Sequence, residues 1–105
     1  MIEICDVSDV AGPYGHRVEI EGTGLFAVFG LDGAYFVIDD LCTHGSASLA
    51  DGRVRGEEVI CPFHRGSFNI RTGEVIRKPC IIPIRTYSAH VIGTKICIAE
   101  PPPIA

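Results

Sequence analysis

The chain has 105 residues, of which 47% are apolar and 21% are charged, and its formal net charge at pH 7 is −4. These values exclude a disordered chain, and the negative charge argues against the phosphate backbone of a nucleic acid as a partner. We therefore expect one domain over residues 1–105 and a partner that presents a basic docking surface.

The first residues contain neither the basic nor the apolar segment of a signal peptide, and no apolar run approaches the ~18 residues of a membrane helix. The five cysteines are an odd number, which does not fit a disulfide framework. We expect a cytoplasmic protein with reduced thiols. Cys5, Cys80 and Cys97 lie outside any Cys/His motif and are expected to be small buried hydrophobic residues.

Short segments rich in Val, Ile, Phe and Tyr alternate with turn signals, and nothing resembles a long amphipathic helix. The expected strands cover residues 17–20, 24–30, 34–38, 84–91 and 95–99, with a tight hairpin at 31–33. A single helical turn fits residues 46–50. Many short strands at this spacing predict an all-β fold, either an antiparallel sandwich or a small barrel.

Two short segments each combine one cysteine with one histidine. Cys42 and His44 form the first pair, and Cys61 and His64 form the second pair after sixteen intervening residues. Thiolate and imidazole suit zinc, copper or an iron–sulfur cluster and do not suit calcium or magnesium. Residues 36–38 lead into the first pair and the apolar residues 58–60 lead into the second, so both pairs fall at strand ends. We therefore expect two ligand loops that clamp a metal centre at one edge of the β scaffold.

The residue types alone leave more than one metal open. A structural zinc site uses the same ligands, but zinc fingers generally keep like ligands together, whereas each segment here mixes them. Blue copper requires one Cys, two His and an axial ligand, and the only methionine is Met1. A colourless structural zinc module therefore stands as the alternative to an iron–sulfur protein.

The pattern C-x-H-x16-C-x2-H resembles the Rieske family of 2Fe-2S proteins, in which two histidines replace two cysteines on one iron. The likeness covers about residues 25–99 and is nearest to the stand-alone ferredoxins of bacterial aromatic-ring-hydroxylating dioxygenases. It implies a Rieske-type antiparallel β-sandwich with a small cluster-binding subdomain made of two ligand loops. It also implies one 2Fe-2S cluster, with Cys42 and Cys61 on one iron and His44 and His64 on the other.

The same resemblance implies an electron carrier and not an enzyme. Such a protein passes single electrons from a flavin-dependent ferredoxin reductase to a terminal aromatic-ring oxygenase, as a monomer that docks transiently, without nucleic acid or membrane. The chain has no nucleotide-binding glycine motif, and His16 and His90 have no metal-ligand partners in sequence. The alternative is a small Rieske subunit of a nitrite-reductase-like complex, although such subunits often lack some ligands and this chain keeps all four.

Four positions indicate a low-potential centre. High-potential relatives have two further cysteines, which form a disulfide, where this chain has Ala47 and Phe63, and hydroxyl donors where it has Gly66 and Phe68. Ser67 offers a hydroxyl one place away from the family position. Fewer hydrogen bonds to the cluster sulfurs stabilise the reduced state less, so we expect a midpoint near the bottom of the range of about −150 to +300 mV.

Several residues near the motifs have two readings. Arg65, Arg77 and Lys78 are either solvated charges or the rim of a docking face. Pro79 is either a simple turn residue or the start of a third loop that covers the cluster.

Overall fold

The computed structural model describes residues 1–10, 14–43, 47–63, 65–78 and 80–99. Within these ranges it contains two 3-10 turns, η1 (Val7–Asp9) and η2 (Leu49–Asp51), and no helix that is long and apolar enough to cross a bilayer. The strands are β1 (Ile2–Asp6), β2 (His16–Ile20), β3 (Gly24–Leu31), β4 (Ala34–Asp39), β5 (Arg53–Arg55), β6 (Glu58–Ile60), β7 (Ser67–Asn69), β8 (Val75–Arg77), β9 (Thr86–Tyr87), β10 (His90–Ile92) and β11 (Lys95–Ile98).

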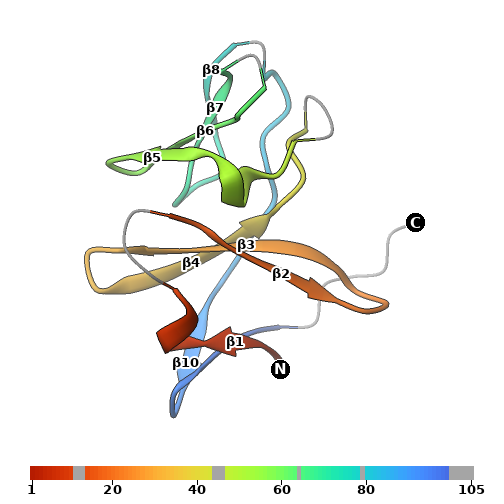
Figure 1. Cartoon of the computed structure of the whole chain (residues 1–105), viewed down its shortest axis with the longest axis vertical. Coiled ribbons are helices and arrows are strands. Elements are labelled where there is room, and N and C mark those ends of the chain that lie inside the picture. Colours follow the sequence, from red (N-terminus) through yellow and green to blue (C-terminus); the bar gives the residue numbers. More distant parts are fainter. Residues whose placement is uncertain (11–13, 44–46, 64, 79, 100–105) are drawn as a thin grey trace.

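The strands form three antiparallel sheets, in the orders β1-β11-β10, β2-β3-β4-β9 and β5-β6-β7-β8. Figure 1 shows the β2-β3-β4 layer across the middle of the molecule, with the β5–β8 sheet at one end and β1 with β10 at the other. The all-β antiparallel sandwich with a separate small subdomain is confirmed.

The hairpin between β3 and β4 agrees with the expectation in detail. Asp32 and Gly33 have φ values of 51° and 79°, the pair of left-handed conformations that a two-residue hairpin turn of type I′ requires. The expected strand at 84–91 is divided instead. β9 pairs with β4 and β10 pairs with β11, because the chain leaves one sheet after Tyr87 and joins the other at His90.

Strand β3 supplies both hydrophobic cores because it is covered on both faces. Phe26 and Val28 point into the sandwich core, which β1 and β11 complete, whereas Ala27 and Phe29 point into the core shared with the β5–β8 sheet. All four side chains are almost fully buried. A strand covered on both faces reads as a continuous apolar run, which is why residues 25–29 show no polar alternation.

Candidate metal centre

Each of the two predicted ligand segments forms a loop that closes on itself through a backbone hydrogen bond. The N–H of Cys42 donates to the carbonyl of Ala47 at 3.0 Å, and the N–H of Cys61 donates to the carbonyl of Gly66 at 2.7 Å. The first loop follows β4, and the second joins β6 to β7. The structure thus places both predicted cysteine ligands at the bases of adjacent loops, whereas the predicted ligands His44 and His64 lie outside the described residues.

The two cysteine sulfurs form a buried soft-donor pair. Cys42 and Cys61 are 2% and 1% exposed and belong to the same core. Burial, followed by a hydrogen bond with the neighbouring Cys42 thiol, raises the pKa of Cys61 to about 11, and a hydrogen bond from the backbone of Phe63 acts in the opposite direction. Two adjacent thiols shielded from water fit the sulfur-ligated iron of a 2Fe-2S cluster, and loading that iron releases their protons.

A third thiol lies against this pair. The sulfur of Cys80 is 3.8 Å from the sulfur of Cys42, and Cys80 is 1% exposed. Gly66 permits this approach, because a Cβ atom at that position would lie 2.3 Å from the Cys80 sulfur. Burial, followed by the contact with Cys42, raises the pKa of Cys80 to about 12, so this thiol stays protonated at neutral pH.

The expected burial of Cys80 is confirmed, but sequence reasoning missed its contact with Cys42. The available signal was its position directly after Pro79, in the loop expected to cover the cluster. The hydroxyl of Thr43 donates to the carbonyl of Ile82 at 2.7 Å, which also fastens this segment to the first ligand loop. Pro79 itself lies outside the described residues.

Asp40 holds the two ends of the first ligand loop together. This carboxylate is 1% exposed and accepts hydrogen bonds from the hydroxyl of Ser48 at 2.7 Å and from the N–H of Ala50 at 3.0 Å. Its remaining oxygen lies 3.4 Å from the guanidinium of Arg17 on β2. A buried charge is tolerated only when it is paired and hydrogen-bonded, and here those partners fix the loop that contains Cys42.

The positions that distinguish high-potential centres have no cysteine or hydroxyl. Ala47 is buried, Phe63 is 54% exposed, and all five cysteines of the chain are free thiols. Phe68 is fully buried in the core that also contains the two predicted ligand cysteines.

The hydroxyl of Ser67 makes its hydrogen bond to a carboxylate. It is buried and donates to the carboxylate of Glu58, which in turn lies 3.2 Å from the guanidinium of Arg77. The structure therefore assigns this hydroxyl to a carboxylate in the β5–β8 sheet.

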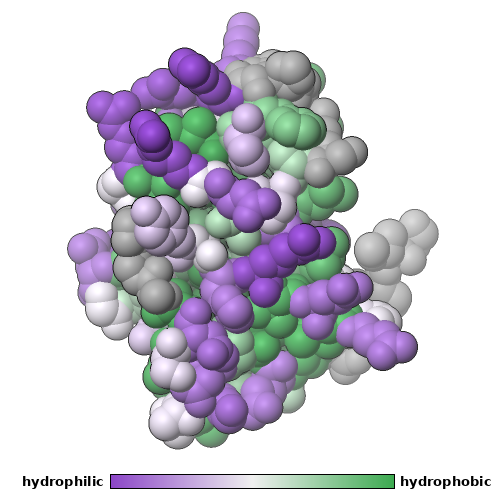
Figure 2. Space-filling model, in the orientation of Figure 1, coloured by the Kyte–Doolittle hydropathy of each residue, from purple (hydrophilic) through white to green (hydrophobic). Residues whose placement is uncertain are grey.

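A groove of about 490 Å³ opens beside Cys61, and cationic side chains dominate its walls. Figure 2 shows strongly hydrophilic side chains over the end of the molecule that carries β5, with others across the middle of the same face. Arg65 has a left-handed backbone (φ 62°), an unusual conformation for a residue with a side chain, and it lies in the second ligand loop. The arginines that line the groove are Arg53, Arg55, Arg65 and Arg77.

Comparisons with known proteins agree with this geometry. Residues 1–88 match the Rieske [2Fe-2S] domain family. The chain is 36% identical over 101 residues to the 3-phenylpropionate/cinnamic acid dioxygenase ferredoxin subunit of Shigella boydii, covering 95% of this chain and 93% of that protein. That relative is named as a ferredoxin subunit, which is an electron-transfer component and not the catalytic one.

Solved structures give the same result. The ferredoxin of Sphingomonas yanoikuyae B1 has a TM-score of 0.92 and 42% identity, covering 95% of this chain and 98% of that one. The ferredoxin in a complex of reduced oxygenase and oxidised ferredoxin of carbazole 1,9a-dioxygenase has a TM-score of 0.87 and 31% identity, covering 99% and 96%.

A nitrite reductase small subunit, the alternative considered from the sequence, is more distant. Its TM-score is 0.78 at 22% identity, covering 93% of this chain and 96% of that one, and this likeness shows the shared fold alone. Together with the two buried cysteines at adjacent loop bases, the match over residues 1–88 shows that this chain belongs to the Rieske [2Fe-2S] domain family and that its cofactor is one Rieske-type 2Fe-2S cluster.

Proposed function

We propose that this chain, a single Rieske domain over residues 1–105, is a low-potential ferredoxin. It takes single electrons from a flavin-dependent ferredoxin reductase and delivers them to the terminal oxygenase of an aromatic-ring dioxygenase system. When bound, the cluster accepts and returns one electron at a time. The supporting observation is the buried pair Cys42 and Cys61 at the bases of two adjacent loops. The five free thiols of the chain fit a location in the reducing cytoplasm.

In this proposal Cys42 and Cys61 hold one iron, and His44 and His64 hold the other. The protein's own part is to keep these ligands in place and water away from the sulfurs. Asp40 fixes the first loop, and the Thr43–Ile82 hydrogen bond ties that loop to the segment that contains Cys80. A fixed ligand set requires little reorganisation when an electron enters or leaves, which favours fast transfer.

We place the docking face on the exposed side of the ligand loops. Leu41, Ile81 and Ile82 are 53%, 76% and 58% exposed there, and the arginine-lined groove adjoins Cys61. An apolar centre with a charged rim is the usual composition of a transient interface. Although the net charge of −4 suggested a basic partner, the arginines favour an acidic patch on the partner at the point of contact.

The ligand assignment is tested by electron paramagnetic resonance of the dithionite-reduced protein. The native protein is expected to give the signal of a Rieske centre, and Cys42→Ser, Cys61→Ser, His44→Asn and His64→Asn are each expected to abolish it. Matched variants outside the site, Cys97→Ser and His90→Asn, are expected to keep it. A colourless protein with tightly bound zinc in place of iron would refute the proposal.

The carrier role is tested by electron transfer between purified partners. The ferredoxin is expected to be reduced by an NADH-dependent flavin reductase and reoxidised by a terminal oxygenase, with rates that fall as salt is raised. The double variant with Arg53→Gln and Arg55→Gln is expected to slow electron transfer at low salt. The control Lys95→Gln, on the β1-β11-β10 sheet, is expected to transfer electrons at the native rate. Equal rates for these variants would place the docking face elsewhere.

A further inference from the structure

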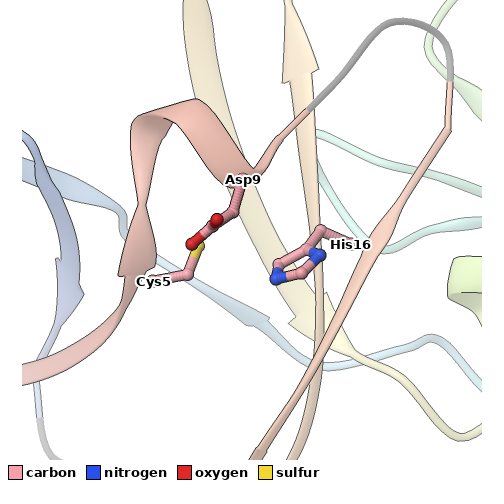
Figure 3. A group of neighbouring side chains, drawn as sticks. All are labelled: Cys5, Asp9 and His16. Atoms are coloured by element: carbon pink, nitrogen blue, oxygen red, sulfur yellow. The ribbon is translucent and has the colours of Figure 1, made fainter.

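Three side chains with metal-binding atoms meet at the N-terminal end of the fold, outside the cluster loops. They are Cys5 on β1, Asp9 on η1 and His16 on β2, and their ligand atoms all lie within 4.8 Å of one another. Figure 3 shows the carboxylate of Asp9 beside the sulfur of Cys5, with the imidazole of His16 facing both. The β5–β8 sheet lies beyond the β2-β3-β4 layer, at the other end of the molecule (Figure 1).

The backbone aims two of these side chains by identifiable means. Between Glu3 and Cys5 the register of β1 against β11 shifts, and such a β-bulge changes the direction of the side chains next to it. Asp9 belongs to a capping box, in which its Oδ2 accepts the N–H of Asp6 at 3.1 Å while the Asp6 side chain accepts the N–H of Ser8 at 2.9 Å. The hydrogen bond from the Asp6 N–H orients the Asp9 carboxylate, as outer partners orient metal ligands.

The other atoms of this cluster that can bind a metal make no hydrogen bond among the described residues. Within the described ranges, the other oxygen of Asp9 accepts no hydrogen bond, and the ring of His16 makes no hydrogen bond or ion pair. The backbone of His16 pairs with Val28 on β3. The site thus presents one sulfur, one carboxylate and one imidazole, and within the described residues their one hydrogen bond is the bond from the Asp6 N–H to Asp9.

The charges around Cys5 favour a cation over a reactive thiol. Burial, followed by the carboxylates of Asp9 and Asp6, raises the pKa of Cys5 to about 11, and the ammonium of Lys95 opposes them only weakly. Lys95 is itself engaged by Asp6 at 3.4 Å. A thiol in such surroundings is a poor nucleophile unless a metal ion displaces its proton. One divalent cation would neutralise the thiolate and the Asp9 carboxylate together.

We propose that Cys5, Asp9 and His16 bind a zinc ion, with water in the fourth position. Zinc accepts this mixture of sulfur, nitrogen and oxygen ligands in a tetrahedral shell, whereas calcium and magnesium require oxygen ligands. The bound ion would join the β1-β11-β10 sheet to the β2-β3-β4-β9 sheet and so anchor the N-terminal strand. His16 has no metal-ligand partner in the sequence, and only the fold brings it to Cys5 and Asp9.

The test uses untagged, cluster-loaded protein, since an apoprotein could bind zinc at the cluster ligands. The protein is incubated with zinc sulfate and desalted, and zinc is measured by mass spectrometry while iron content and visible absorption report the cluster. We expect about one zinc per chain beside an unchanged cluster. Zinc X-ray absorption is expected to show one sulfur at about 2.3 Å and nitrogen or oxygen ligands at about 2.0–2.2 Å.

Variants distinguish zinc bound at this site from zinc bound elsewhere on the protein. Cys5→Ser, Asp9→Asn and His16→Asn are each expected to weaken zinc binding at least about tenfold, with iron content and circular dichroism unchanged. His90→Asn, an exposed histidine on β10, is expected to bind zinc like the native protein. The proposal is overturned if the loaded protein retains no zinc, if His16→Asn retains as much as the native chain, or if two sulfurs surround the ion.

Discussion

The sulfur of Cys80 lies 3.8 Å from the sulfur of Cys42, although 38 positions separate the two residues in sequence. As the proposed iron ligand, a Cys42 thiolate would only accept a hydrogen bond, so the buried Cys80 thiol would be the donor. A hydrogen bond to a ligand sulfur stabilises the reduced state of the cluster.

We therefore expect Cys80→Ala to lower the midpoint potential by about 20 to 60 mV, the one-electron equivalent of a hydrogen bond of about 0.5–1.5 kcal/mol. A spectroelectrochemical titration measures the change. Cys97→Ala removes another buried thiol, from β11, and is expected to leave the potential unchanged. Equal potentials for the native protein and Cys80→Ala would show that the thiol does not act on the cluster.

Gly66→Ala is expected to lower both the melting temperature and the iron content per chain. The new Cβ would lie 2.3 Å from the sulfur and 3.0 Å from the backbone nitrogen of Cys80, and overpacking of this kind costs about 1–3 kcal/mol. Gly30→Ala is the control, because its Cβ would meet its neighbours at 3.6 Å or more. Adding Cys80→Ala is expected to restore part of the loss, since the sulfur contact is then gone. No rescue would place the conflict in the backbone alone.

Ser67→Ala is expected to destabilise the protein without altering its potential. The hydroxyl is buried and donates to the carboxylate of Glu58, and its loss leaves that carboxylate short of a partner, at a cost of about 1–3 kcal/mol. Thermal unfolding and a redox titration on the same sample measure the two quantities. A fall in midpoint beyond the error of the titration would mean that Ser67 reaches the cluster after all.

Asp40→Ala is expected to speed the release of iron to a chelator. The substitution removes the acceptor of the part-buried Ser48 hydroxyl and the buried Ala50 N–H, and an unsatisfied buried donor costs about 1–3 kcal/mol. Asp40→Asn keeps an oxygen acceptor in place and loses mainly the ion pair with the half-exposed Arg17. The alanine variant should therefore release iron faster than the asparagine variant, and equal rates would show that the carboxylate does not hold the loop.

Because the Tyr87 hydroxyl ionises in alkali, the free energy of unfolding is expected to fall above pH 10. This hydroxyl donates to Asp39 at 2.5 Å, and burial, followed by this bond, raises its pKa from 10.0 to about 12. The folded state therefore holds the proton more tightly than the unfolded state. The contribution is complete below pH 10 and is lost as the pH rises through about 12.

The difference in melting temperature between the native protein and Tyr87→Phe should shrink over that window. Tyr14→Phe, at an exposed position, is the control for general effects of alkali. A difference that stays constant from pH 8 to about pH 12 would contradict the assignment.

Local sequence was sufficient for features that depend on neighbouring residues. The Cys/His spacing indicated the family, which the comparisons confirm, and Asp32-Gly33 predicted the hairpin because turn geometry depends on two consecutive φ angles. The cysteines and hydroxyls missing at Ala47, Phe63, Gly66 and Phe68 were visible without a structure. The low potential inferred from them stays a prediction.

Tertiary structure alone decided the contacts between distant segments. It brought the Cys80 thiol to Cys42, gave the Ser67 hydroxyl to Glu58 and gathered Cys5 and His16 around Asp9. It also divided residues 84–91 between two sheets. These contacts follow from which strands pair and in which register. Because strand pairing is set by burial summed over the whole chain, no single segment contains that information.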